Sequence, residues 1–169
     1  MSHDVPLAAS SVSFHTVDPV SDVAQVAVGG YFAELDARFP GGFDAQGQST
    51  KDAHLLAAPH GAFVVALRDA EGGPALACGG VQTITGPDGV TYGEIKRMWV
   101  SPEARGLGLG SRLLRHLETL AGELGHHLVR LDTNDALVEA IGMYRRAGYA
   151  EVERYNDNPY ARHFFEKRL

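Results

Sequence analysis

Residues 94–111 read EIKRMWVSPEARGLGLGS, a strand-like run that leads into a loop with glycine at positions 106, 108 and 110. Leucines then recur at helical spacing from Leu109 to Leu124. The first N–H groups of a helix lack internal partners, and the helix dipole favours negative charge beside them. We therefore interpret the loop as a phosphate cradle between a strand and a helix.

The segments on either side predict a mixed α/β fold. Short glycine-rich turns separate the apolar runs at 62–67, 75–84 and 91–100, which favours antiparallel hairpins. The predicted order is β-α-α-β-β-β-α-β-α-β-β, a mixed sheet of about seven strands with about four helices. We expect the other strands at 12–17, 127–132, 149–154 and 162–169, and helices at 23–37, from a cap at Ser49 to Leu56, at 109–124, and from Asn134 or Asp135 to 148.

Two features modify this outline. Gly29-Gly30 should weaken the first helix, because glycine is a poor helix former. Residues 1–10 are expected to form a flexible tail, which leaves 11–169 as a single domain.

Composition limits the classes of protein to consider. The 169 residues suffice for one domain with a core, and no apolar run approaches the ~18 residues that cross a bilayer. The N-terminus lacks the features of a signal peptide, and Cys78 is the single cysteine, so we expect a cytoplasmic protein without membrane contact. The net charge of −6 argues against a nucleic-acid partner. The eight histidines include no pair at metal-binding helical spacing, so we expect no metal.

Two other phosphate-binding motifs fit the loop less well. A P-loop requires lysine and then serine or threonine after its last glycine, whereas Gly110 precedes Ser111-Arg112. A dinucleotide-binding fingerprint is closer, since Asp132 ends the next predicted strand. However, hairpins precede the loop, and the residues after it are too few for a six-stranded parallel sheet. The loop could also be only a tight strand-to-helix turn.

Two motifs in order resemble the GNAT superfamily of N-acetyltransferases. Arg105, Gly108 and Gly110 match the core of the first motif, and the segment from Asn134 through Tyr144 to Tyr149 resembles the second. The resemblance covers residues 11–169 and implies a GNAT-type fold, acyltransferase activity and acetyl-CoA as co-substrate. The family also makes a homodimer plausible.

The resemblance implies a set of donor-binding residues. The strand residues Met98, Trp99 and Val100 would pair with the pantetheine arm, and one N–H would polarise the thioester carbonyl. Asn134 would contact the coenzyme A arm, or else cap a helix. The backbone amides that would hold the pyrophosphate are those of Arg105, Gly106, Leu107, Gly108, Leu109, Gly110 and Ser111.

It also implies two catalytic residues. Glu94 occupies the position of a general base in some members, and Tyr144 matches the tyrosine that protonates the departing thiolate. Strand alternation would put Glu94 on one face with Lys96, Met98 and Val100. The alternatives are an ion-paired strand glutamate and a core-packing tyrosine.

The acceptor is the least determined part. We expect a primary amine of a small molecule, with Tyr31, Glu34 and Asn156 among the residues that contact it. Acidic and aromatic side chains could hold a cationic amine. A protein or peptide N-acetyltransferase and a non-catalytic acyl-CoA binder remain alternatives. Further candidate residues are Phe32, Phe39, Phe43, Asp44 and the loop at 155–160.

Overall fold

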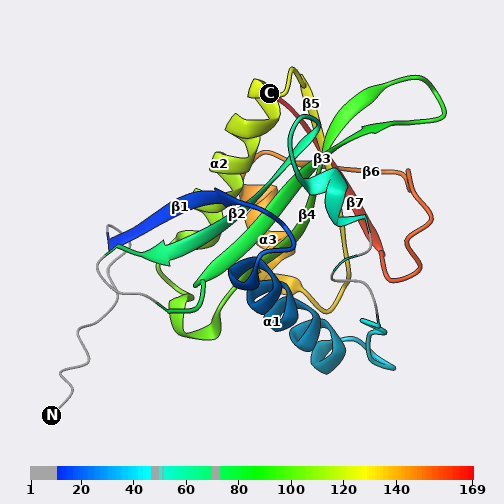
Figure 1. Ribbon diagram of the computed structural model, residues 1–169. Coiled ribbons are helices and arrows are strands. Elements are labelled where there is room, and N and C mark those ends of the chain that lie inside the picture. The colour runs from blue at the N-terminus through cyan, green and yellow to red at the C-terminus, as the bar shows by residue number, and fades with distance from the viewer. Residues whose placement is uncertain (1–10, 47–49, 51, 70–72) are drawn as a thin grey trace, which may run out of the picture.

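The computed structural model describes residues 11–46, 50, 52–69 and 73–169. The predicted tail at 1–10 and the cap at Ser49 lie outside these ranges. The described residues form a seven-stranded sheet in the order β1-β2-β3-β4-β5-β7-β6 (Figure 1). No helix within these ranges combines the length and the apolar character that a membrane crossing requires.

The sheet has an antiparallel first half and a mixed second half, as predicted. Strands β1 (Val12–Val17), β2 (Gly61–Arg68), β3 (Ala77–Thr85) and β4 (Thr91–Val100) pair antiparallel in chain order. Strand β5 (Leu128–Thr133) is parallel to β4. Strand β7 (His163–Arg168) pairs antiparallel with both β5 and the edge strand β6 (Ala150–Val152).

Three α-helices cover the sheet, α1 (Asp22–Arg38) on one face and α2 (Leu109–Glu123) and α3 (Val138–Arg146) on the other (Figure 1). The predicted second helix is only a 3₁₀ turn, Ala53–Leu56, so the α-helix count is lower than expected. Leucines of α2 and inward residues of β2, β3 and β5 make one core, and α1 packs on a second core that includes Phe63 and Val65.

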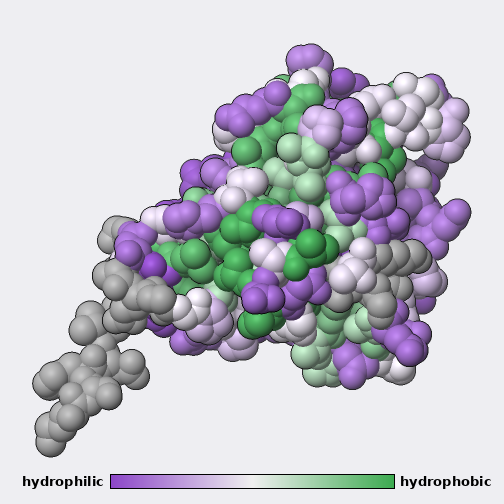
Figure 2. Space-filling view, viewed as in Figure 1, coloured by the Kyte–Doolittle hydropathy of each residue, from purple (hydrophilic) through white to green (hydrophobic). Residues whose placement is uncertain are grey.

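Helix α1 runs through Gly29-Gly30 without a break. A Cβ on Gly30 would lie 2.8 Å from the indole of Trp99, so Gly30 lets α1 approach β4 closely. The outer face of α1 carries exposed Val26, which explains its imperfect apolar pattern. Figure 2 accordingly shows apolar residues interspersed with polar ones on the side that carries β1 and α1.

A β-bulge interrupts β4 at Arg97. Trp99 pairs with Cys78 and Lys96 pairs with Gly80, so β4 contains one more residue than β3 between these pairs. Arg97 takes up the extra residue with a φ of 57°, in the left-handed region. The alternation predicted for this strand is therefore wrong. Glu94 and Lys96 lie on the α1 face, whereas Met98 and Val100 pack against the α2 core.

Strands β4 and β5 separate soon after they pair. Their register includes only Gly93 with Val129 and Glu94 with Arg130, whereas β4 continues to Val100. Beyond Glu94, the edge of β4 that faces β5 has no partner strand among the described residues. This edge lies directly before the glycine loop.

We predict that His163 makes the stability of this fold depend on pH. Hydrogen bonds to Glu151 and Asp135 raise the pKa of His163, although burial acts in the opposite direction. The charged imidazole therefore stabilises the folded state fully below the ordinary pKa of about 6.5, and this contribution disappears as the pH rises through the raised value. His163→Gln should lower the melting temperature at pH 6 and have a much smaller effect at pH 9. An equal loss at both values would contradict this assignment.

Candidate active site

The glycine loop has the backbone conformation that its sequence predicts. Gly106 and Gly108 have φ values of 80° and 72°, which only glycine adopts without strain, and Gly108 is the N-cap of α2. Gly110 lies in the first turn, where a Cβ would be 3.1 Å from the sulfur of Met143 in α3. The loop therefore presents the N-terminal N–H groups of α2 beside a closely packed helix pair.

A cavity of about 390 Å³, here called the glycine-loop cavity, lies between this loop, the end of β4, α1 and α3. It contains nearly all the predicted donor-binding residues. Its lining includes Met98, Trp99, Val100, Arg105, Gly106, Gly108, Leu109, Gly110 and Ser111.

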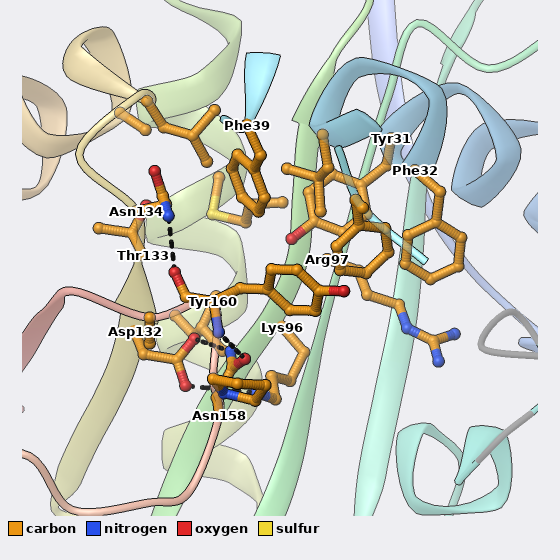
Figure 3. Close-up of a pocket in the computed structure, with 18 of the residues that line it drawn as sticks. Tyr31, Phe32, Phe39, Lys96, Arg97, Asp132, Thr133, Asn134, Asn158 and Tyr160 are labelled. Atoms are coloured by element: carbon orange, nitrogen blue, oxygen red, sulfur yellow. Dashed lines mark hydrogen bonds and ion pairs between the residues drawn. The ribbon is translucent and has the colours of Figure 1, made fainter. Parts of the chain in front are cut away.

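A second cavity of about 590 Å³, here called the aromatic cavity, lies between α1, the opening of the sheet and the loop before β7 (Figure 3). Five aromatic residues predicted for the acceptor or its neighbourhood line it: Tyr31, Phe32, Phe39, Phe43 and Tyr160. The two cavities share a wall, so molecules bound in each would meet there. The shared residues are Tyr31, Leu35, Met98, Leu137, Ala140 and Tyr144.

Two tyrosines of the shared wall are held protonated. Burial raises the pKa of Tyr144, and the nearby charge of Asp132 raises it further. Burial also raises the pKa of Tyr31, and the nearby Tyr144 and Asp132 raise it further. Each hydroxyl therefore carries its proton at neutral pH and can donate a hydrogen bond at the place where the cavities meet.

A buried charged cluster lies where β4 and β5 separate. The Glu94 carboxylate accepts a hydrogen bond of 2.9 Å from Gln82 Nε2 and lies 3.5 Å from Lys96 Nζ. Asp132 lies 3.6 Å from the same Lys96 Nζ. Asn156 Nδ2 donates to both carboxylates, at 3.3 Å to Glu94 and 2.5 Å to Asp132. Asn156 thus joins the two acids from the loop.

Lys96 remains charged within this cluster. Burial lowers its pKa, but Glu94 and Asp132 together raise it above the ordinary value. Lys96 and Asp132 line the aromatic cavity, whereas Glu94 lies behind them and is only 4% exposed. The predicted alternative for Glu94, an ion pair with a lysine, is therefore present, but in a buried cluster rather than on an exposed strand.

For two predicted site residues, the structure exchanges the cavities: an expected acceptor contact lines the glycine-loop cavity, and an expected donor contact lines the aromatic cavity. Glu34 was predicted to contact the acceptor, yet it forms an ion pair with Arg105 and lines the glycine-loop cavity. Asn134 was predicted to contact the donor, yet it lines the aromatic cavity. The Asn134 amide donates to the Tyr160 carbonyl at 2.7 Å, and its oxygen accepts from the Ala136 N–H at 2.9 Å. Asn134 therefore fixes the turn before α3, which begins only at Val138.

Three charged residues line the aromatic cavity although none of them was among the acceptor or catalytic residues expected from the sequence: Lys96, Arg97 and Asp132. One signal was present for Asp132. It lies near the carboxyl end of a strand parallel to β4, and such strand ends commonly carry ligand-binding side chains. No local pattern indicated the bulge that places Arg97 in the cavity.

Comparisons with known proteins agree with this geometry. The chain is 41% identical over 101 residues to an uncharacterized N-acetyltransferase of Schizosaccharomyces pombe. The aligned region spans 60% of this chain and 59% of that protein. It is 35% identical over 118 residues to the IAA acetyltransferase of Azospirillum brasilense. That alignment spans 70% of this chain and 73% of the relative. A predicted acetyltransferase of Clostridium acetobutylicum, solved with acetyl-CoA, has the same fold, with a TM-score of 0.68 and 17% identity over 87% of this chain and 95% of that one.

The family match covers the glycine loop and most of the residues around the two cavities. The sequence profile of the Acetyltransferase (GNAT) family matches residues 31–149, which include α1 from Tyr31, the glycine loop and Tyr144. The glycine-loop geometry, the two adjoining cavities and this match lead to one conclusion: the chain belongs to the GNAT acetyltransferase family and is an acyltransferase.

Proposed function

We propose that this protein transfers the acetyl group of acetyl-CoA to a primary amine of a small molecule, by direct attack in a ternary complex. The observation that carries the proposal is the shared wall of the two cavities, because a donor in one and an acceptor in the other would meet beside Tyr144. The relative named IAA acetyltransferase supports a small-molecule acceptor.

The glycine-loop cavity suits acetyl-CoA. The N–H groups at the start of α2 would hold the pyrophosphate, and the free edge of β4 near Met98 would pair with the pantetheine arm. An N–H of that edge would also stabilise the negative charge that develops on the thioester oxygen. The acetyl-CoA in the Clostridium acetobutylicum structure supports this choice of donor.

The charged cluster supplies a route for the proton of the amine. A protonated amine in the aromatic cavity would lose its proton toward Asp132, which lines the cavity, and Glu94 behind it is connected to Asp132 through Asn156 and Lys96. Glu94 would therefore act as base through the cluster or a water molecule. The neutral nitrogen then attacks the thioester carbon.

Tyr144 supplies the opposite proton. As the carbon–sulfur bond breaks, the departing thiolate would take the hydroxyl proton of Tyr144, which burial keeps in place until that moment. The nitrogen becomes cationic when it attacks, and it would then give its second proton to the tyrosinate, which restores the Tyr144 hydroxyl. The products are an N-acetylated amine and free coenzyme A. Tyr31 shares this wall and would orient the reacting groups.

We predict that Gly108→Val lowers the affinity for coenzyme A about fivefold to thirtyfold, by about 1–2 kcal/mol, because a β-branched residue strains the left-handed N-cap of α2. Isothermal titration calorimetry would measure the affinity, and thermal unfolding would check that the fold persists. Gly122→Val is the matched control, since it introduces the same side chain into the same helix, where the space is open. Unchanged affinity in Gly108→Val would contradict the cradle assignment.

We predict that Tyr144→Phe lowers kcat about a hundredfold or more while the affinity for coenzyme A is retained. Thiol release from acetyl-CoA over a panel of amines measures the rate. Tyr149→Phe should keep its rate, because Tyr149 packs beside Tyr144 but lines neither cavity. Equal rates in wild type and Tyr144→Phe would rule out the acid role. If wild type turns over no small amine or peptide yet binds acetyl-CoA, the protein is an acyl-CoA binder.

We predict that Asp132→Asn and Glu94→Gln each lower kcat/KM about a hundredfold, because each removes a carboxylate from the proton route. The amides keep the size of each side chain, but each points an NH₂ group at an amide donor of Gln82, Asn156 or Asn158. Thermal unfolding therefore has to show that each variant is folded before its rate is compared. Glu123→Gln, at the exposed end of α2, serves as the control. A full rate in either cluster variant would exclude that carboxylate from the route.

A further inference from the structure

We propose that the acceptor is a primary amine that also carries an aromatic ring and a carboxylate, and that Arg97 binds this carboxylate. The inference rests on the proposed acetyl transfer to a small amine and names the class of that amine. Arg97, the aromatic wall and the charged cluster carry it together.

The bulge in β4 holds Arg97 in the aromatic cavity. A regular strand would direct neighbouring residues 96 and 97 to opposite faces, but the left-handed φ of 57° at Arg97 leaves both Lys96 and Arg97 lining the cavity. Left-handed backbone is unfavourable for a residue with a side chain, and such strain is concentrated at functional sites. A glycine at this position would remove the strain, so the chain carries arginine here at a cost.

The surroundings of the guanidinium favour a flat apolar ligand. The Arg97 guanidinium lies over the ring of Phe32 at 5.7 Å from its centroid. Phe32 stacks on Phe43 at 5.3 Å between centroids, and Phe43 contacts Tyr160 at 4.7 Å. These rings form a continuous wall along the cavity, against which an aromatic body can pack (Figure 3).

The two cations of the cavity have different surroundings. Lys96 remains charged, and its positive charge is compensated by the carboxylates of Glu94 and Asp132. Burial lowers the pKa of Arg97, but the guanidinium stays charged because the ordinary pKa of arginine lies far above neutral pH. Asp52, at the exposed rim, is one of the groups that act against this shift. A guanidinium has five N–H donors in a planar fork, which can accept a ligand carboxylate beside or in place of Asp52.

The same cavity also contains a negative charge, that of Asp132. Asp132 and Arg97 appear on opposite sides of the Tyr160 ring in Figure 3. A ligand with an amine at one end and a carboxylate at the other therefore matches the cavity, with the amine toward Asp132 and the shared wall. A simple cationic amine would offer no carboxylate to the Arg97 guanidinium, which belongs to a residue that lines the same cavity.

The test compares matched pairs of acceptors with and without the carboxylate. Suitable pairs are phenylalanine with phenethylamine, tryptophan with tryptamine, and 4-(aminomethyl)benzoate with 4-methylbenzylamine. In wild type, kcat/KM should be higher for the carboxylate member of at least one pair. In Arg97→Gly this preference should fall about tenfold to a hundredfold, mainly through KM, as expected for the loss of hydrogen bonds to a charged group.

The variants are chosen so that the fold persists. Glycine accepts the φ of position 97 without strain, and Arg97→Asn is a second variant because asparagine tolerates the left-handed region better than most residues. Arg97→Lys keeps the charge but loses the fork, and it should give an intermediate preference. Arg68→Ala, which removes an arginine paired with Glu103 away from both cavities, should leave the preference unchanged.

The outcomes separate this inference from the proposed function. Acetylation of both members of each pair at equal rates, or a preference that survives in Arg97→Gly, would overturn the carboxylate assignment and leave the N-acetyltransferase intact. If no amine releases coenzyme A although acetyl-CoA binds, the proposed transfer fails. Calorimetry with the three amino carboxylates on the coenzyme A complex then decides the inference. Binding that weakens in Arg97→Gly would support it, and no binding to wild type would overturn it.

Discussion

The separation of β4 from β5 is the constraint on which the site depends. These parallel strands pair only at Gly93 and Glu94, and β4 then follows β3 to Val100. The separation leaves one edge of β4 free beside the glycine loop and makes space for both cavities. A fully paired sheet would use the same N–H groups in its ladder, and the proposed pairing of the donor with β4 would then be impossible.

The charged side chains buried where β4 and β5 separate all have polar partners. Unpaired charges are expensive in a protein interior, and removing one partner of a buried pair costs about 3–5 kcal/mol. Here Lys96 joins Glu94 and Asp132, while Gln82, Asn156 and Asn158 occupy carboxylate oxygens with amide hydrogens. The cluster therefore keeps the buried charges compensated where the sheet opens and, in the proposed mechanism, accepts the proton of the acceptor.

Helix α1 lines both cavities, and two of its side chains form ion pairs with residues on the other side of the glycine-loop cavity. Glu34 pairs with Arg105 of the glycine loop, and Arg38 pairs with Glu139 of α3 at 2.8 Å. Such partly exposed pairs contribute about 0–1 kcal/mol each, so they orient the helix more than they hold it. The close packing of Gly30 on Trp99 and the buried side of α1 supply the larger part of its attachment.

The sequence by itself determined the features that depend on neighbouring residues. The glycine loop, the hairpins, α2 and the order of strands all follow from local turn chemistry and apolar periodicity, and the GNAT motifs identified the family. The structure places Tyr31 and Tyr144 on the wall that the two cavities share, and most of the residues predicted to bind the donor line one cavity. The catalytic and binding roles of these residues remain predictions.

Only the tertiary structure decided the bulge at Arg97, the cluster around Lys96 and the cavities beside which Glu34 and Asn134 lie. Each of these depends on residues far apart in the chain. The bulge is defined by register against β3, the cluster joins β4, β5 and the loop before β7, and Glu34 meets Arg105 across a cavity. Periodicity describes one segment at a time, so it cannot indicate where two strands separate or which distant charge lies opposite.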